Sequence, residues 1–404
     1  MTRTRLVLLS GLMLFLELAL IRWTGSNILY LSYFSNFVLL ASFLAIGIGF
    51  LRGSTGQSLF PLAPVALAIL VAFVTVFPVR IDRSGSELIY FGALGTRTGL
   101  PTWLTLPIIF VGVAVVMAMV ANGVARAFAE FPPLDAYRLD ITGSLAGIVA
   151  FTILSFTGAP PLAWGLLVVL AFGLLLERPY RAPQIVSAAA LLLLLGVASA
   201  TPLSSWSPYY KIHLNPQPNG SIGVLVNGIP HQTIESVALR SRLIPLYLLP
   251  YQRAATHPHS LLIVGAGTGD DVAIALAQGV ESIDAVEIDP RIHDIGVALH
   301  PDHPYQDPRV HAYVNDGRAF LEQTHARYDM ILFALPDSLT LVAGQSSLRL
   351  ESYLFTFEAM QQARAHLTPQ GVFGEYNYYR EQWLVDRLAG TLQAAYGLLP
   401  CEDT

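Results

Sequence analysis

The sequence predicts a protein of two domains: an N-terminal polytopic α-helical membrane domain, and a C-terminal Rossmann-like α/β domain preceded by a small β-hairpin module. Of its 404 residues, 53% are hydrophobic and 13% charged, which is more apolar and less charged than a typical soluble domain. Long apolar runs fill residues 1–200, whereas beyond residue 259 apolar strands alternate with helical stretches. This composition excludes a disordered chain and a purely soluble enzyme.

Charge divides the chain in the same way. Residues 1–200 hold 11 of the 23 Lys and Arg and 7 of the 28 Asp and Glu, a net charge of +4; the remaining 12 and 21 give residues 201–404 a net charge of -9. We expect a multi-helix membrane domain over 1–200, a linker and small β module over 201–258, and a nucleotide-binding catalytic domain over 259–404. The total of -5 disfavours a nucleic-acid partner.

The first half contains apolar runs of membrane-spanning type. A spanning helix needs about 20 predominantly apolar residues. Runs of that order, bounded by charge, cover 6–21, 34–51, 59–79, 104–128, 141–156, 162–176 and 185–200. The first contains Glu17 and lacks a small-residue cleavage site, so we interpret it as a retained helix and not as a signal peptide. We expect six or seven spans, and the short last run is the first candidate for not spanning.

Two acidic residues lie in or against these runs. An ionisable group at such depth is a functional hypothesis by default, which applies to Glu17 and Asp140. The alternatives are a local pair of Glu17 with Arg22, and a helix start at Asp140. The small-xxx-small spacing from Gly143 to Gly147 predicts close helix packing.

A small β module is expected after the membrane domain. Residues 201–208 are rich in Pro and Ser and are typical of a linker. Residues 222–226 and 229–234 flank Asn227-Gly228, which favours a type I′ turn and therefore a hairpin.

A glycine turn opens the α/β domain. Strand 261–264 leads into the turn 265–269, followed by helix 272–278 and strand 282–286. The glycines of the turn permit close approach of a ligand to the backbone, and the acid after the second strand can accept hydrogen bonds from ribose hydroxyls. These predicted cofactor-binding residues are Gly265, Gly267, Gly269 and Glu287.

Two carboxylates, Asp270 and Asp271, follow the glycine turn. They would repel a pyrophosphate at this helix start and suit a ligand with a cationic end. The alternative is that they cap the helix. We include Asp270 among the predicted cofactor-binding residues.

Further acids follow the next strands. Strand 310–314 ends before Asp316-Gly317, where a carboxylate can accept a hydrogen bond from an adenine amino group. Strand 328–333 leads to Asp337, at the carboxyl end where open α/β sheets bind ligands. Helix 357–366, strand 372–376 and helix 382–396 complete the core, and the sequence ends before the last two strands of a typical sheet of this kind. The glycine turn, Glu287 and Asp316 together resemble the class I S-adenosylmethionine fold of methyltransferases.

The order of motifs resembles the spermidine synthase family of aminopropyltransferases, in the bacterial version fused to an N-terminal membrane domain. The matching stretches are 207–212, 227–232, 265–269, 316–317, the loop of Asp337, and 354–356. The resemblance implies decarboxylated S-adenosylmethionine or S-adenosylmethionine as co-substrate without a metal, and a polyamine or other small amine as acceptor. It further implies a bacterial inner membrane location with a cytoplasmic catalytic domain, and a homodimer is possible in such a family.

Some predicted site residues depend on this resemblance. A nucleoside would be held by Glu287 and Asp316, and the amine would lie near Gln232 and Asp337. Tyr210 and Tyr376 are further substrate-binding candidates, although packing explains the position of Tyr376 equally well.

The chain also departs from the family pattern. Ala334 stands where the family has the first of two aspartates, Thr268 where its glycine loop has an aspartate, and Tyr210 where it has a glutamine. The histidines lack the spacing of metal ligands.

Three functions remain open from the sequence. The leading hypothesis is a membrane-anchored aminopropyltransferase in which Asp337 is catalytic, because an amine with a pKa near 10 must be positioned and deprotonated before it attacks. The alternative is a methyltransferase acting on a membrane-delivered acceptor, which Thr268 and Ala334 favour. A transporter with a nucleoside-sensing domain is the third, supported by Glu17 and Asp140.

Overall fold

The chain divides into two compact units. The computed structural model describes residues 3–33, 36–53, 57–78, 80–82, 96–98, 100–177, 179–334, 350–376 and 382–402. One unit comprises residues 1–213 with 226–229, and the other comprises residues 214–225 with 230–404. The predicted catalytic Asp337 lies outside the described residues.

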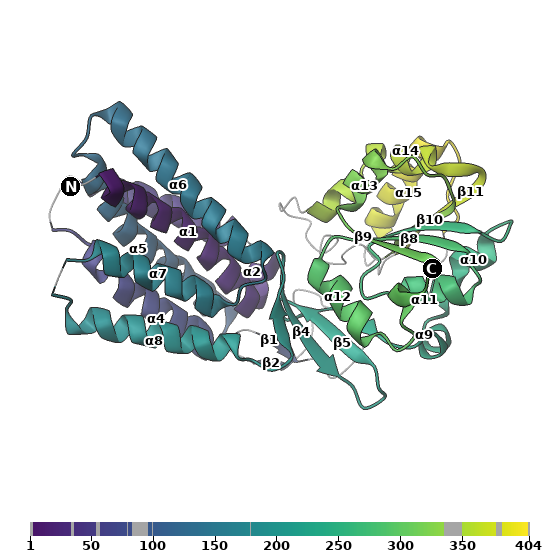
Figure 1. Ribbon diagram of the computed structural model, residues 1–404, viewed down its shortest axis with the longest axis horizontal. Coiled ribbons are helices and arrows are strands. Elements are labelled where there is room, and N and C mark those ends of the chain that lie inside the picture. Colours follow the sequence, from purple (N-terminus) through teal and green to yellow (C-terminus); the bar gives the residue numbers. More distant parts are fainter. Residues whose placement is uncertain are drawn as a thin grey trace. The chain divides into compact units, whose positions relative to one another are not determined.

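The first unit is a bundle of apolar helices that lie side by side (Figure 1). Each of the seven apolar runs in the sequence overlaps one of its longer helices. The elements are α1 (Arg3–Asn27), α2 (Leu29–Tyr33), α3 (Asn36–Leu51), η1 (Phe60–Leu62), α4 (Ala63–Val76), α5 (Thr102–Phe128), α6 (Pro133–Phe156), α7 (Pro161–Leu175) and α8 (Ala182–Ser199). A short antiparallel pair, β1 (Arg80–Asp82) with β2 (Thr96–Thr98), lies between α4 and α5 in the sequence.

Four helices of the described chain are long and apolar enough to cross a membrane: α1, residues 103–128 of α5, α6 and α8. The shorter apolar helices are α3, residues 60–76 and α7. The last run, which the sequence singled out as too short, is therefore among the longer helices. Membrane insertion itself stays a prediction.

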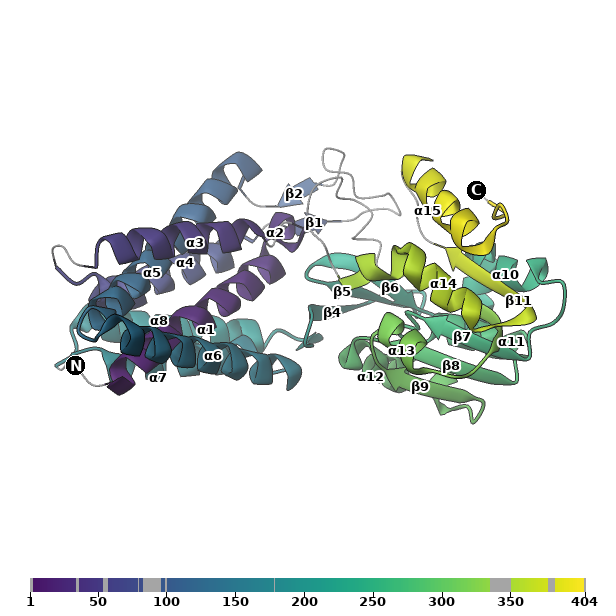
Figure 2. The same cartoon turned by 90° about the horizontal axis from the view of Figure 1, so that it is seen from above.

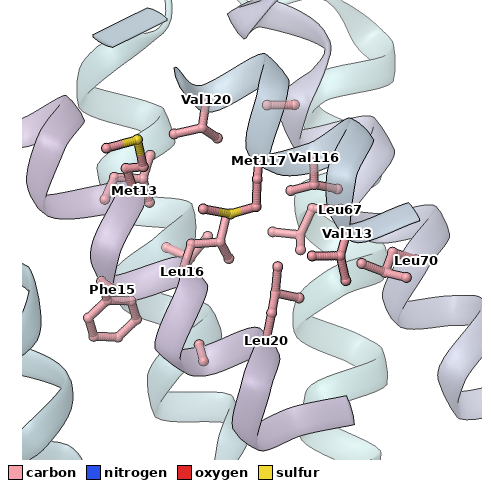
Figure 3. Packing of buried hydrophobic residues seen from close by; sticks show 14 of the residues in the cluster. Met13, Phe15, Leu16, Leu20, Leu67, Leu70, Val113, Val116, Met117 and Val120 are labelled. Carbon is pink, nitrogen blue, oxygen red and sulfur yellow. The ribbon is translucent and has the colours of Figure 1, made fainter. Parts of the chain in front are cut away.

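The bundle core lies between α1, α4 and α5. Figure 3 shows Met117 of α5 between Leu16 and Leu20 of α1 and Leu67 of α4. These side chains are at most 2% exposed. Full burial of such side chains contributes about 1.5–3 kcal/mol each when the reference is water.

Helices α1 and α6 approach each other closely at glycines. A Cβ atom added at Gly147 would lie 2.2 Å from the carbonyl oxygen of Gly11, and one at Gly143 would lie 2.3 Å from that of Val7. Ser10 on α1 donates a hydrogen bond to Asp140 of α6 at 2.6 Å. The packing predicted for Gly143 and Gly147 is therefore present. The predicted helix start at Asp140 is wrong, because α6 begins at Pro133 with a proline in its first turn.

Glu17 and Arg22 of α1 have different surroundings. Glu17 is 3% exposed, and its Oε1 has no hydrogen-bond partner within the described part of the chain. Arg22 donates to Ser155 Oγ at 2.6 Å and to the carbonyl of Ser207. The expected pairing of Glu17 with Arg22 is thus replaced by contacts of Arg22 with α6 and with the turn that follows Trp206.

A four-stranded sheet in the order β3-β4-β5-β6 follows the bundle. Its strands are β3 (Ser204–Trp206), β4 (Lys211–Pro216), β5 (Ile222–Val226) and β6 (Ile229–Ile234). Asn227 and Gly228 have φ angles of 51° and 80°, as a type I′ turn requires, so the predicted hairpin is confirmed. The stretch predicted as a linker contributes β3 to this sheet.

The second unit is built on a parallel five-stranded sheet in the order β11-β10-β7-β8-β9 (Figure 2). The strands are β7 (Ser260–Val264), β8 (Ser282–Glu287), β9 (Val310–Val314), β10 (Tyr328–Ala334) and β11 (Leu367–Tyr376). The predicted α/β fold with a parallel sheet is therefore confirmed. Strand β11 begins at Leu367, before the expected start at 372, and its register with β10 shifts between Leu367 and Val372.

Helices cover both faces of this sheet (Figure 1). One core cluster joins the sheet to α9 (Val237–Leu243), η2 (Pro245–Leu248), α10 (Leu249–Arg253) and α11 (Asp270–Ala277). The other joins it to α13 (Gly317–Gln323), η4 (Leu350–Phe355), α14 (Phe357–Ala365) and α15 (Gln382–Tyr396). The remaining elements are α12 (Pro290–Leu299) and η3 (Pro304–Gln306).

The strand order changes direction between β7 and β10. The helix that follows β7 packs on one face and the helix that precedes β10 packs on the other. Open α/β sheets bind ligands outside the carboxyl ends of the strands at such a switch point. A ligand site is therefore expected at the ends of β7, β8, β9 and β10.

Candidate functional site

The glycine turn connects β7 to α11 in a conformation that requires glycine. Gly265, Gly267 and Gly269 have φ angles of 84°, 56° and 102°. A Cβ atom at Gly267 would lie 2.4 Å from Gln232 Oε1, and one at Gly269 would lie 2.8 Å from Pro304. Both the backbone geometry and the neighbours thus exclude larger residues.

Glu287 ends β8 and holds this turn in place. Its Oε2 accepts a hydrogen bond from the Gly267 N–H at 2.8 Å, and its Oε1 accepts one from the Asp289 N–H at 2.8 Å. Burial raises the pKa of Glu287 to about 7, and hydrogen bonds with backbone groups of Asp289, Gly267 and Ile288 act in the opposite direction. The structure therefore brings together the glycine turn and the acid that the sequence paired with it. The ribose-binding role of Glu287 stays a prediction.

Asp316 and Gly317 lie at the end of the next strand, β9. Asp316 caps α13 by accepting a hydrogen bond from the Ala319 N–H at 2.9 Å. A Cβ atom at Gly317 would lie 2.3 Å from Val264 Cγ1, so the start of α13 packs against the end of β7. The predicted adenine-binding role of Asp316 is untested, and its capping role is an additional finding.

Gln232 of β6 contacts the glycine turn directly. Its Oε1 accepts hydrogen bonds from both the N–H and the hydroxyl of Thr268, each at 3.0 Å. Its Nε2 is buried without a hydrogen-bond partner in the described chain, so a donor remains available beside the turn. Thr268 itself is fully buried.

Asp270 bonds to groups of the protein itself. It is 7% exposed, lies 3.4 Å from the Arg240 guanidinium and accepts a hydrogen bond from the Glu235 N–H at 3.2 Å. His300 Nε2 lies 3.5 Å from its Oδ1. The N-cap of α11 is Gly269, with no side-chain cap bond. The capping alternative is therefore not realised for Asp270, and the cation that faces it is Arg240.

Tyr376 ends β11 and faces α11. Its hydroxyl donates a hydrogen bond to Asp271 Oδ1, and its ring makes an edge contact with Tyr247 at 5.5 Å between centroids. Tyr376 is 8% exposed, so packing accounts for most of its surface. Its predicted substrate contact stays untested.

The two other substrate candidates cannot be placed at this site. Tyr210 belongs to the first unit, in a turn where Ser207 Oγ accepts hydrogen bonds from the N–H groups of Tyr209 and Tyr210. Asp337 lies outside the described residues.

Tyr305 is a site residue that the sequence did not indicate. Its hydroxyl donates to the carbonyl of Gly267 at 2.7 Å, and its ring would lie 3.0 Å from a Cβ atom at Gly269. The ring of His293 packs against it at 4.7 Å. In the sequence, the neighbouring Pro304 indicates the start of the short helix that carries Tyr305, but no pattern indicates its contact with the glycine turn. Among the described residues, no group of three or more His, Cys, Asp or Glu could hold a metal ion.

Part of the chain is similar to a known family of proteins. Residues 246–395 match the family model described as the spermine/spermidine synthase domain. The resemblance to the spermidine synthase family is therefore confirmed for these residues.

Curated relatives that match the chain are named polyamine aminopropyltransferases, which are transferases. That of Alkaliphilus oremlandii is 33% identical over 113 residues, covering 27% of this chain and 39% of the relative. That of Buchnera aphidicola is 30% identical over 122 residues, covering 29% and 40%. That of Salmonella arizonae is 30% identical over 125 residues, covering 30% and 41%. The chain thus spans about two fifths of the length of these relatives.

Parts of the chain are also similar to solved structures. Spermidine synthase from Thermotoga maritima has a TM-score of 0.35 and 20% identity, covering 47% of this chain and 62% of that one. Human methyltransferase-like protein 13 in complex with SAH has a TM-score of 0.31 and 24% identity, covering 41% and 75%.

Proposed function

We propose that this chain is a membrane-anchored aminopropyltransferase, which moves an aminopropyl group from decarboxylated S-adenosylmethionine to a polyamine or another small amine. The observation that carries the proposal is the match of residues 246–395 to the spermine/spermidine synthase domain. That stretch includes the glycine turn, Glu287 and Asp316, which lie at the ends of three adjacent strands. The four long apolar helices support the anchoring.

The arrangement of polar groups suits an adenosyl ligand beside the glycine turn. Gln232 offers a buried N–H donor next to Gly267. The Glu287 carboxylate accepts one hydrogen bond at each oxygen, which leaves acceptor capacity for a ribose hydroxyl. We infer that the nucleoside binds along Glu287 and Asp316, with its sulfonium toward β10.

Product identity tests the proposal. The purified full chain in detergent is incubated with radiolabelled decarboxylated S-adenosylmethionine and a diamine such as putrescine. We expect release of methylthioadenosine together with a lengthened amine. Absence of methylthioadenosine with every amine tried would remove the proposal.

A methyltransferase is the second candidate, because two positions lack a carboxylate for an amine. Thr268 is buried with its hydroxyl bonded to Gln232, and Ala334 is 3% exposed at the end of β10. The same assay with S-adenosylmethionine and a membrane lipid extract distinguishes the two functions. Release of S-adenosylhomocysteine in place of methylthioadenosine would favour methyl transfer.

A further inference from the structure

The carboxylate of Asp271 lies at the edge of the site near Ala334, the position where the family pattern has an aspartate. Ala334, at the end of β10, is paired in register with Tyr376, at the end of β11. The Tyr376 hydroxyl donates to Asp271 Oδ1, and Asp271 follows the glycine turn by two residues in the first turn of α11. The Asp271 carboxylate is thus held on the β10 side of the turn, where ligands of open α/β sheets bind.

We propose that Asp271 is the proton acceptor for the amine and that Tyr376 is its positioning residue. This inference rests on the proposed function. The pair would supply the carboxylate that Ala334 cannot. Within the described residues, the bond from Tyr376 is the one hydrogen bond of the half-buried Asp271 side chain, so Oδ2 remains available for an ammonium group.

The surroundings of Asp271 suit a general base. Burial raises the pKa of Asp271 to about 7, the neighbouring Asp270 adds to this shift, and Arg240 opposes it. A base with a pKa near the working pH combines a large deprotonated fraction with high basicity. The titratable and charged groups that face Asp271 come from its own helix, α9, α10, η3 and β11: Asp270, Arg240, Tyr251, Tyr305 and Tyr376.

The chemical step then balances. Asp271 takes one proton from the ammonium, which leaves a neutral amine and a protonated carboxyl group. The amine nitrogen attacks the carbon next to the sulfonium, and the new N–C bond forms as the C–S bond breaks. The electron pair of that bond stays on sulfur, so methylthioadenosine leaves as a neutral thioether. The positive charge passes to the product nitrogen.

The pH dependence of turnover tests this role. In the full chain, Asp271→Asn should lower the rate about 10²–10⁴-fold and abolish the rise in rate around pH 7. Tyr376→Phe removes a hydrogen bond to the charged carboxylate, so the same rise should move to higher pH while turnover persists. If the contact between Tyr376 and Asp271 were purely structural, its loss would change stability but would not shift the rise in rate near pH 7.

The controls separate this inference from the function on which it rests. Glu281→Gln removes one acid before the start of β8, at the opposite end of the sheet, and should keep the wild-type profile. An active wild type with an unchanged profile in Asp271→Asn would overturn the inference alone. The inference would also be overturned if Asp337→Asn abolished the rise in rate near pH 7 while Asp271→Asn kept it. A wild type that forms no methylthioadenosine would overturn the proposed function and this inference with it.

Discussion

At the scale of single residues, the site depends on carboxylates whose oxygens bond to the backbone. Glu287 joins the end of β8 to the glycine turn through Gly267 and to the start of α12 through Asp289. A hydrogen bond from a backbone N–H to a charged acceptor contributes more than one between neutral groups. Glu287 therefore has a structural role whether or not it also binds a ribose.

Glu287→Gln should weaken both the fold and ligand binding. The amide keeps one acceptor oxygen, but its NH₂ group faces a backbone N–H that then has no acceptor. We expect a loss of about 1–3 kcal/mol in the free energy of unfolding and weaker binding of methylthioadenosine. Chemical unfolding and calorimetric titration measure the two effects. Glu281→Gln is the matched control, and equal behaviour of the two variants would contradict the prediction.

At the scale of elements, the crossing of α1 and α6 has the least room for change. The backbones of Val7 and Gly11 meet Gly143 and Gly147 without an intervening side chain. Small residues allow such close approach, which improves van der Waals packing between helices.

Gly147→Ala should separate α1 from α6. The new Cβ would lie 2.2 Å from the Gly11 carbonyl oxygen, so one helix must move. Overpacking of this kind costs about 1–3 kcal/mol. Gly47→Ala on α3 is the control, because no atom lies within 4 Å of its added Cβ. Thermal unfolding in detergent should show a lower midpoint for Gly147→Ala only; an equal midpoint would refute the predicted clash.

Helices and strands are the features that the sequence predicted best. Helix Gln382–Tyr396 and both strands around Asn227-Gly228 have the expected bounds, because local periodicity and turn chemistry determine them. Contacts between distant residues were not predictable in the same way. Thr268 bonds to Gln232, which is 36 positions away, and Asp270 meets Arg240. No local pattern encodes such partners, so the alternatives for Asp270 could be decided only from the structure.

At the scale of the whole molecule, buried acids make stability depend on pH. Asp271 and Glu287 both have folded-state pKa values raised to about 7, whereas the unfolded chain releases these protons near pH 4. Between these values the folded state binds more protons than the unfolded state. The free energy of unfolding should therefore fall as pH rises from about 4 to about 7 and then level off.

Denaturant unfolding of the full chain between pH 5 and pH 8 measures this dependence. Asp271→Asn should flatten the fall in the free energy of unfolding, because one of the carboxyl groups with a raised pKa no longer titrates. Asp307 and Asp329 have lowered pKa values and so titrate below this window. A stability that rises over this range, or a slope unchanged in the variant, would contradict the prediction.

The guanidinium of Arg22 lies 5.3 Å from the ring centre of Trp164 and 5.5 Å from that of Trp206, and it donates to the Ser207 carbonyl. A shortened protein starting at residue 201 would lose the cation and one of the two indoles. The remaining indole, now 7% exposed, would face water, and the Ser207 oxygen would need a new donor. Removing the helices would therefore expose an aromatic surface beside residues 207–212, one of the stretches that match the family pattern.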